Sequence, residues 1–337
     1  MDDNLPRAGI SRRDALRLAG NGALLVGAAS LLSACGGGSS GSQDFSLQLG
    51  WVPDAEYSGF FMAAENGHFA KNGLTPKILP GGPTTSPEPI VLTGKALLAV
   101  EPVPENVANA AQRGNDLKIV GAQFQRSPEC WVSLAKAPVK TPGDIVGKKL
   151  GITLSGKNTA LAFLRKNGVD PAKVTLVPIS FDPAPLVAGE IDALWGIATN
   201  QPVTLGEKGT QTHTMLLADY GFNRMQDVLV TTGAALKDPD KAALLKKVVA
   251  ASQQGWQDAL GNPAAAAQTT VTKYGKSLGL TATSQVKTLE AMKPFMQPAA
   301  GGPVLTMSDA LIKDTVNALQ NIVGVKTSPS LFTNELF

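Results

Sequence analysis

The chain has 337 residues, and its 30 lysines and arginines against 27 aspartates and glutamates give a formal net charge of +3 at pH 7. This near balance excludes a protein built around a basic face, so no nucleic-acid partner is expected. Only two histidines and two cysteines are present, which leaves few metal ligands, and the length predicts two lobes rather than one core.

Residues 1–34 have the pattern of a bacterial export signal. Arg12 and Arg13 precede an apolar run over residues 18–32, and Ser33-Ala34 stands before Cys35. A charged start, an apolar middle and a small-residue cleavage site are typical of such signals, and the arginine pair favours the twin-arginine route over the general one. Residues 32–35 resemble a lipobox, so we expect Cys35 to carry lipid and to hold the exported protein at the membrane surface of the cell envelope. A secreted protein with an unmodified Cys35, or a membrane-spanning anchor, is the alternative.

Residues 35–44 are rich in glycine and serine, a composition that predicts a flexible tether. Loss of residues 1–34 removes four arginines and three aspartates, so the net charge becomes +2. With Cys35 acylated, only Cys130 remains, and an intramolecular disulfide is excluded.

From residue 45 onward, short apolar segments alternate with helical patterns. Strands are expected at 45–49, 74–79, 96–100, 117–122, 130–134, 149–153, 174–177, 191–194, 214–217 and 228–232. Helices are expected between them, as at 58–66 and 158–166, and then at 241–260, 263–274, 281–295 and 308–322. This alternation predicts an α/β protein with two mainly parallel sheets and C-terminal helices.

Two stretches, residues 90–99 and 185–195, share one order of helix, glycine, charged residue, short strand and loop. One copy in each half predicts two similar lobes, with coincidence as the alternative, since this order is common in α/β proteins. We expect residues 45–135 with 230–337 to form the first lobe and residues 136–229 the second. Crossings are expected near 134–139 and 228–232, and two thin crossings would make a hinge. The C-terminal helices are expected to pack back on the first lobe.

Ligands of open α/β sheets bind beyond the carboxyl ends of the strands. In the first lobe this rule selects Trp51, Asp54, Tyr57, Gly81, Gly82, Thr84, Glu101, Gln123 and Gln125. In the second lobe it selects Ser155, Asn158, Thr159, Trp195, Asn200, Asp219 and Tyr220.

The tryptophan at the first strand exit is the strongest single candidate. Trp51 would stack on a planar ring, with Trp195 and Tyr220 facing it from the other lobe; a tryptophan that only covers the sheet end is the alternative. Asp54, Glu101 and Asp219 would accept hydrogen bonds from amino groups, or be ordinary surface acids.

Two loop segments offer backbone groups. Gly81-Gly82 allows a ligand to approach the main chain, or forms a plain turn. Residues 155–159 begin a helix whose free N–H groups suit an anion or a carbonyl oxygen, or hold only an N-cap.

Signals for catalysis are missing from the sequence. Neither His68 nor His213 belongs to a metal-binding spacing, and no Walker loop occurs. Cys130 lies in an apolar strand, where a buried, inert thiol is expected. We therefore expect no catalytic residue, no cofactor and no metal.

Several segments resemble one family in their order and spacing. They are Leu49-Gly50-Trp51-Val52-Pro53-Asp54, residues 64–74, Gly81-Gly82-Pro83, residues 121–128, residues 141–152 and Asn200-Gln201-Pro202. Together they resemble the SsuA/THI5-like (NMT1) family of nitrate-, sulfonate- and pyrimidine-precursor-binding proteins, over roughly residues 45–236. His68 departs from the family, which more often has tyrosine there, at what we interpret as a packing position.

The resemblance implies a two-lobed periplasmic-binding-protein fold of type II that closes on a small molecule and presents it to the permease and ATPase of an ABC importer. We expect the ligand to be a planar nitrogen heterocycle, such as a pyrimidine precursor of thiamine, with riboflavin also possible. A sulfonate, taurine or nitrate ligand is the alternative, for which Lys157 is the only obvious cation. A sensor domain is another alternative. A pyrimidine-synthase-type enzyme would need a cysteine-rich motif that is absent.

Overall fold

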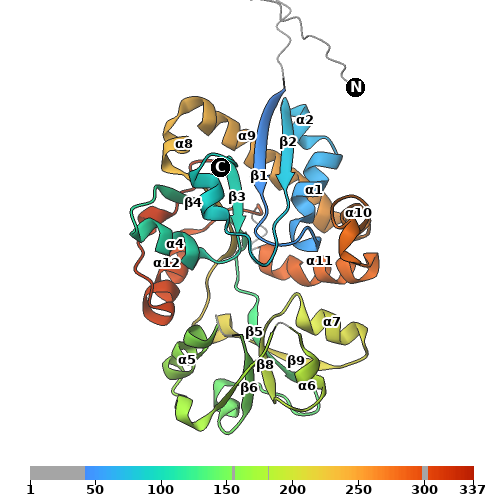
Figure 1. The fold of residues 1–337 in the computed structure, drawn as a ribbon, viewed down its shortest axis with the longest axis vertical. Coiled ribbons are helices and arrows are strands. Elements are labelled where there is room, and N and C mark those ends of the chain that lie inside the picture. Colours follow the sequence, from blue (N-terminus) through green and yellow to red (C-terminus); the bar gives the residue numbers. More distant parts are fainter. Residues whose placement is uncertain (1–41, 154–155, 181, 298–302) are drawn as a thin grey trace, which may run out of the picture. The chain divides into compact units, whose positions relative to one another are not determined.

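In the described part of the chain, ten strands form two sheets of five (Figure 1). The computed structural model describes residues 42–337 except 154–155, 181 and 298–302. The first sheet has the order β2-β1-β3-β10-β4 and the second the order β7-β6-β8-β5-β9. The strands are β1 Gln43–Gln48, β2 Leu74–Leu79, β3 Leu98–Glu101, β4 Leu117–Phe124, β5 Glu129–Leu134, β6 Lys149–Ile152, β7 Thr175–Pro178, β8 Ala193–Ile197, β9 Thr212–Leu216 and β10 Gln226–Thr232.

The helices occupy both faces of each sheet. They are α1 Ser58–Glu65, α2 His68–Lys71, α3 Pro87–Leu92, α4 Pro104–Gln112, α5 Lys157–Lys166, α6 Ala184–Val187, α7 Gln201–Glu207, α8 Gly233–Lys237, α9 Pro239–Gly261, α10 Pro263–Thr269, α11 Ala282–Met296 and α12 Asp309–Ala318. Short turns of other helix types include η2 Ala55–Tyr57, η5 Leu217–Tyr220 and η8 Leu319–Val323. Each sheet with its helices is called a lobe below, the first sheet giving the first lobe.

The internal similarity noticed in the sequence has a structural counterpart. Gly94 (φ 71°) lies between α3 and β3, and Gly189 (φ 75°) lies between α6 and β8. Glycine adopts these left-handed angles without strain, so it ends the helix at both places. β3 and β8 then occupy the same central position in their sheets. The two lobes share one strand order.

Both sheets are mixed, with four strands running in one direction and a single strand against them, so the prediction of mainly parallel sheets is confirmed. β1 pairs parallel with β2 and β3, and β6 pairs parallel with β7 and β8. β10 is antiparallel to both its neighbours, as is β5 in the second sheet. These two strands enter their sheets directly from the other lobe, so they run away from the boundary at which the other strands of the sheet end.

Sheet membership differs from the expected lobe bounds at two places. β5 was expected at the end of the first lobe, but it pairs with β8 and β9 in the second sheet. Residues 226–229 were expected in the second lobe, but they belong to β10, which pairs with β3 and β4 in the first sheet. The chain therefore crosses between β4 and β5, over residues 125–128, and returns between η5 and β10, over residues 221–225. Hydrophobicity marks both segments as strands, but it does not show which sheet a strand joins.

Each sheet lies between two hydrophobic layers. In the first lobe, one layer joins β1 to α1, α9, α10 and α11, and the opposite layer joins β3 and β10 to α3, α4 and α12. In the second lobe, α5 covers one face, while α6 and α7 cover the other. Among the described residues, no helix is both long and apolar enough to cross a lipid bilayer.

The C-terminal helices pack on both lobes, not only on the first as expected. Ala318 and Ile322, at α12 and η8, belong to the hydrophobic cluster of the second lobe, which contains Phe163 of α5. Lys287 Nζ on α11 lies 3.5 Å from Glu207 Oε1 on α7. The two crossings are therefore supplemented by packing between the lobes.

Candidate functional site

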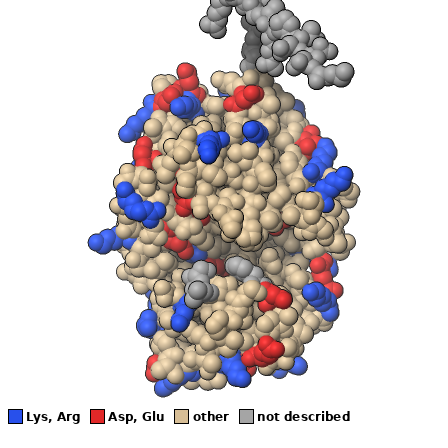
Figure 2. Space-filling view, viewed as in Figure 1, with Lys and Arg blue, Asp and Glu red and all other residues tan. Residues whose placement is uncertain are grey.

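The polar residues of the first lobe gather at one edge of its sheet. β1 and β3 end at this edge, and β10 begins there, because Val228 of β10 pairs antiparallel with Glu101 of β3. Asp54 follows β1, and its carboxylate caps η2 by accepting from the Glu56 N–H at 2.9 Å. The surface is hollowed between the lobes, and acidic side chains are visible inside the hollow (Figure 2).

Four carboxyls belong to this edge: Asp54, Glu56, Glu101 and Asp227. We call them the acid cluster. Gln123 links two of its segments, since its Nε2 donates to the Glu56 carbonyl at 2.7 Å and to Asp227 Oδ2 at 3.1 Å. Asp227 has a positive φ of 49°, an angle that aspartate tolerates better than most residues. Among the described residues, no ion pair includes any of the four acids.

Burial raises the pKa of every carboxyl in the acid cluster. The pKa of Asp54 and that of Glu101 rise to about 8, through burial first and then through the neighbouring acids Glu56 and Glu88 respectively. Burial also raises the pKa of Glu56 and raises that of Asp227 well above its usual value, and these two carboxyls share a hydrogen bond. A low-dielectric site without a cation disfavours the charged forms, so the cluster retains protons at neutral pH.

Three buried polar atoms at the cluster have no hydrogen-bond partner within the described residues. They are Tyr57 Oη, Glu101 Oε2 and Gln123 Oε1. Tyr57 and Gln123 are fully buried, and Glu101 is 1% exposed. The second oxygen of Glu101, Oε1, accepts from Asn106 Nδ2 at 2.8 Å. Unpaired buried polar atoms are costly, so this edge suits a ligand that donates hydrogen bonds.

Trp51 and Gly81 lie together beside the cluster. Trp51 is partly buried against the core of the first lobe, and its carbonyl accepts from the Gly81 N–H at 3.0 Å. A Cβ at Gly81 would lie 2.3 Å from the Leu49 carbonyl oxygen. Glycine is therefore required at position 81, because the main chain there lies in contact with the main chain that follows β1. Gly82 has open space around its Cα, and Thr84 is exposed.

The aromatic candidates of the second lobe make contacts inside that lobe. Trp195 is 8% exposed and packs edge-on against Trp131, with ring centroids 5.4 Å apart. Tyr220 Oη donates to the Lys140 carbonyl at 2.9 Å. Asp219 forms an ion pair with Arg126. A ring sandwich between Trp51 and these aromatics stays a prediction.

The remaining candidates are scattered. Thr159 is partly buried at the first turn of α5, while Asn158 and Asn200 are exposed. Gln125 Nε2 lies 3.4 Å from the Pro303 carbonyl. Ser155 lies outside the described residues.

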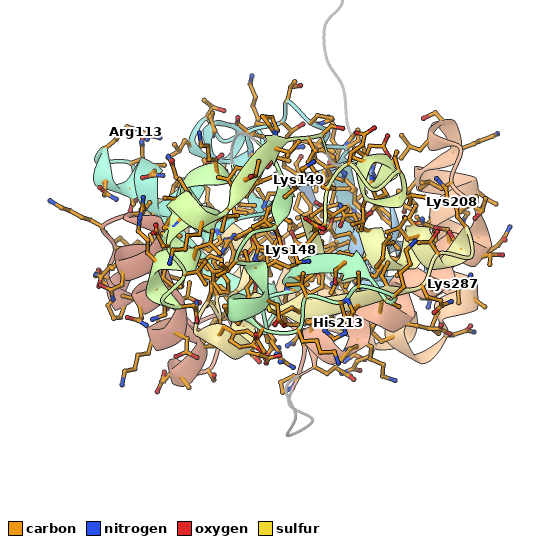
Figure 3. The ribbon with its side chains drawn as sticks, turned by 90° about the horizontal axis from the view of Figure 1, so that it is seen from below. Arg113, Lys148, Lys149, Lys208, His213 and Lys287 are labelled. Carbon is orange, nitrogen blue, oxygen red and sulfur yellow. The ribbon has the colours of Figure 1, made fainter. Side chains whose placement is uncertain are left out.

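Basic residues of the second lobe lie mainly at the end of its sheet away from the boundary. Figure 3 looks onto this end and shows Lys148, Lys149, Lys208 and His213. Lys149 and His213 lie at the beginnings of β6 and β9, and both strands run toward the first lobe. Lys157, at the start of α5, is exposed. The other histidine, His68, pairs with Asp258 through Nε2 at 2.6 Å and so has the packing position expected for it.

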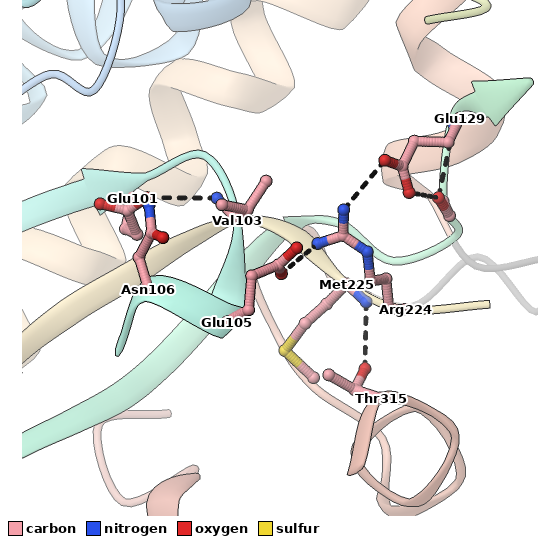
Figure 4. Close-up of polar contacts among 9 residues, drawn as sticks. Glu101, Val103, Glu105, Asn106, Glu129, Arg224, Met225 and Thr315 are labelled. Atoms are coloured by element: carbon pink, nitrogen blue, oxygen red, sulfur yellow. Dashed lines mark hydrogen bonds and ion pairs between the residues drawn. The ribbon is translucent and has the colours of Figure 1, made fainter. Parts of the chain in front are cut away.

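The second crossing carries a buried ion network (Figure 4). Arg224 is 2% exposed, with Nη1 2.6 Å from Glu105 Oε2 on α4 and Nη2 2.9 Å from Glu129 Oε1 on β5. Burial opposes the charge of Arg224, but the two glutamates outweigh it and raise its pKa. The Met225 N–H donates to Thr315 Oγ1 on α12 at 3.0 Å. Arg224 thus joins the first lobe to the second at the hinge.

The sequence rule missed Glu56, Asp227 and Arg224. It selects residues that follow strands, whereas Asp227 and Glu129 stand at the starts of β10 and β5, which run in the opposite direction. Both residues could have been found in the sequence as acids at the start of an apolar strand that follows a crossing between the lobes. Glu56 could have been found from its position two residues after Asp54.

No described group of histidine, cysteine, aspartate and glutamate side chains is arranged to hold a metal ion. Cys130 is a buried, free thiol, and burial raises its pKa. A thiol that stays protonated is a poor nucleophile.

A separate concavity of about 580 Å³ lies at the outer end of the first sheet, near the beginning of β1. Phe45, Leu97 and Leu244 line it together with Lys77 and Lys241. It contains none of the residues selected from the sequence, and it lies at the edge opposite the acid cluster.

Comparison with known proteins identifies similar chains. A family model described as NMT1/THI5 like matches residues 54–266. The chain is 25% identical to the riboflavin-binding protein RibY of Chloroflexus aurantiacus over 66% of this chain and 64% of that protein. It is 29% identical to a formylaminopyrimidine-binding protein of Halalkalibacterium halodurans over 64% of this chain and 66% of that protein. The matches thus span slightly less than two thirds of these relatives.

The fold is also that of a solved structure. The periplasmic aliphatic sulphonate binding protein SsuA from Escherichia coli superposes with a TM-score of 0.63 at 16% identity, covering 85% of this chain and 94% of that one. At this identity the likeness concerns the fold alone.

Proposed function

The chain belongs to the NMT1/THI5-like family, and from this premise we propose that it is the solute-binding protein of an ABC importer. Its two lobes close over a small planar nitrogen heterocycle, such as a pyrimidine precursor of thiamine, and the closed form docks on the permease and ATPase. The two named relatives bind riboflavin and a formylaminopyrimidine, which are both nitrogen heterocycles. This agreement supports the class of ligand.

The observation that carries the proposal is the set of unpaired acceptors at the boundary between the lobes. Glu101 Oε2 and Gln123 Oε1 are buried without partners among the described residues. Amino groups on a heterocycle would satisfy such atoms, and Trp51 beside them would lie against the ring. Two lobes joined by short crossings supply the motion that encloses the ligand.

The same residues disfavour a sulfonate or nitrate ligand. The edge holds the carboxyls of Asp54, Glu56, Glu101 and Asp227 without a cation in ion-pair contact among the described residues. Such a cluster offers an anion no opposite charge, and any of its acids that ionises repels the anion. Lys157, the only cation that the sequence offered for an anion, is exposed at the start of α5.

Calorimetry on the purified full-length protein tests the proposed ligand class. The panel contains an aminopyrimidine, riboflavin, taurine and nitrate. We expect binding of the aminopyrimidine at micromolar or lower Kd and heat close to the dilution blank for taurine and nitrate. Binding of taurine or nitrate alone would reject the proposal, and turnover of any bound compound would replace it with an enzyme.

We propose that Cys35, which lies outside the described residues, is acylated and anchors the protein after export. The support is the sequence pattern alone. Labelling with a fatty acid that carries an alkyne should mark the native protein but not Cys35→Ala, and that variant should move from the membrane fraction to the soluble fraction. An unlabelled native protein would sink this part of the proposal and leave solute binding untouched.

A further inference from the structure

The acid cluster has more acceptors than the protein itself can satisfy. Among the described residues, Glu101 Oε2 and Gln123 Oε1 have no donor other than the acids themselves, since the Glu101 carboxyl shares a hydrogen bond with that of Glu88, and both side chains are at least 99% buried. Gln123 is held in place because its Nε2 already donates to Asp227 and to the Glu56 carbonyl. Its free oxygen is therefore an acceptor fixed inside the cluster.

The cluster also has no cation in ion-pair contact among the described residues, so protons take the place of a counter-charge. The titratable groups that act on it are acids from four elements and one phenol: Asp54 and Glu56 at η2, Glu101 at β3, Asp227 at β10, Glu88 at α3 and Tyr57. A metal ion does not fit, because no described set of acids has the arrangement that a metal requires. A group with both positive charge and N–H donors would meet the charge and the free acceptors together.

We infer, on the basis of the proposed function, that the ligand binds through a positively charged nitrogen group bearing at least two N–H donors, such as a primary ammonium, seated on Glu101 and Gln123. Binding of this group releases protons from the acid cluster to solvent. The only bond that breaks is the O–H bond of a carboxyl, whose proton passes to water as the ammonium takes its place beside the resulting carboxylate.

The direction of the pH dependence follows from this exchange. Burial raises the pKa of Glu101 and of Asp54 to about 8, so near neutral pH a cation must displace protons in order to bind. Its affinity therefore rises as pH increases from about 6 to about 8, the range in which a primary ammonium keeps its charge. A neutral ligand that accepts hydrogen bonds from the protonated acids shows the opposite trend.

Two probes that differ in one charge separate these cases. The first is an aminopyrimidine with an aminomethyl arm, and the second is the same compound with the arm N-formylated and neutral. Calorimetry at pH 7 in phosphate and in Tris, which differ in ionisation enthalpy, counts the protons released. We expect the amine to bind more tightly, with net proton release and with affinity that increases with pH.

Two amide variants and one matched control identify the site. Glu101→Gln and Asp227→Asn remove one ionisable group each while preserving shape, and asparagine tolerates the positive φ at position 227. Each should weaken binding of the amine by about tenfold or more, the loss expected for one charge-assisted hydrogen bond, and should reduce proton release. Glu290→Gln changes an exposed acid on α11 and should leave both quantities unchanged. Thermal melting of each variant verifies folding.

The outcomes distinguish this inference from the proposed function. Tighter binding of the N-formyl compound, or binding of the amine without proton release, overturns the inference and leaves a solute-binding protein. If riboflavin binds but neither pyrimidine does, the inference is likewise rejected. If none of the heterocycles binds, both the inference and the proposed ligand class fail.

Discussion

At the scale of single residues, the hinge provides two arginines in contrasting settings. Arg224 is buried between Glu105 and Glu129, which belong to different lobes. Arg126, in the first crossing, pairs with Asp219 at the surface, where the two side chains are 47% and 53% exposed. Water competes with the second pair but not with the first, so the two crossings differ in how firmly they are held.

Arg224→Met should destabilise the protein by roughly 3–5 kcal/mol, because it leaves two buried glutamates without their cation. Arg126→Met should cost at most about 1 kcal/mol, as exposed ion pairs do. Urea unfolding monitored by tryptophan fluorescence measures both free energies. Equal losses in the two variants would contradict the distinction drawn here.

At the scale of elements, the first lobe depends on a close contact between α1 and α9. A Cβ on Gly255 of α9 would lie 2.1 Å from the Gly59 carbonyl oxygen and 2.5 Å from the Ala63 nitrogen. A Cβ on Gly59 would lie 2.1 Å from the Trp256 ring. The two helices approach through these glycines, which allows the buried Trp256 to pack edge-on near Phe60 at 6.0 Å between centroids.

Gly255→Ala should destabilise the protein by about 1–3 kcal/mol or more, because the added methyl group forces α1 and α9 apart in a packed core. Gly261→Ala is the matched control on the same helix, since a Cβ there meets nothing within 4 Å. The control should be neutral or stabilising by up to about 1 kcal/mol, as alanine favours the helix. Urea midpoints compare the two, and an unchanged midpoint for Gly255→Ala would refute the contact.

At the scale of the whole molecule, the acid cluster affects stability as well as binding. Four carboxyls at the boundary between the lobes have raised pKa values in the folded protein, whereas the unfolded chain titrates near its usual pKa of about 4. The folded state therefore holds more protons between about pH 4 and pH 8. The raised pKa values therefore stabilise the folded protein fully below about pH 4, and this stabilisation is lost as the pH rises through about 8.

The ligand-free protein should consequently melt at a lower temperature at pH 8 than at pH 5.5, by at least about 2 °C, the shift that roughly 1 kcal/mol gives in a protein of this size. Asp227→Asn should flatten this dependence, because the amide has no proton to lose, and Glu290→Gln should retain it. Differential scanning calorimetry across the pH range measures the trend. A wild-type melting temperature that rises with pH would contradict the raised pKa values, because it would show that ionisation of the cluster does not destabilise the folded protein.

The sequence by itself determined the ten strands, the main helices, the α/β class and the similarity of the two halves, because periodicity and helix-ending glycines such as Gly94 and Gly189 are local signals. It also placed Asp54, Glu101 and Gln123 at one edge through the rule for strand ends. Only the tertiary structure added Glu56 and Asp227 to that edge and put Arg224 between the lobes. It also showed that Trp195 and Tyr220 contact residues of their own lobe. The physical reason is that β5 and β10 enter from the opposite lobe, so their pairing and the direction of nearby side chains depend on segments about a hundred residues away.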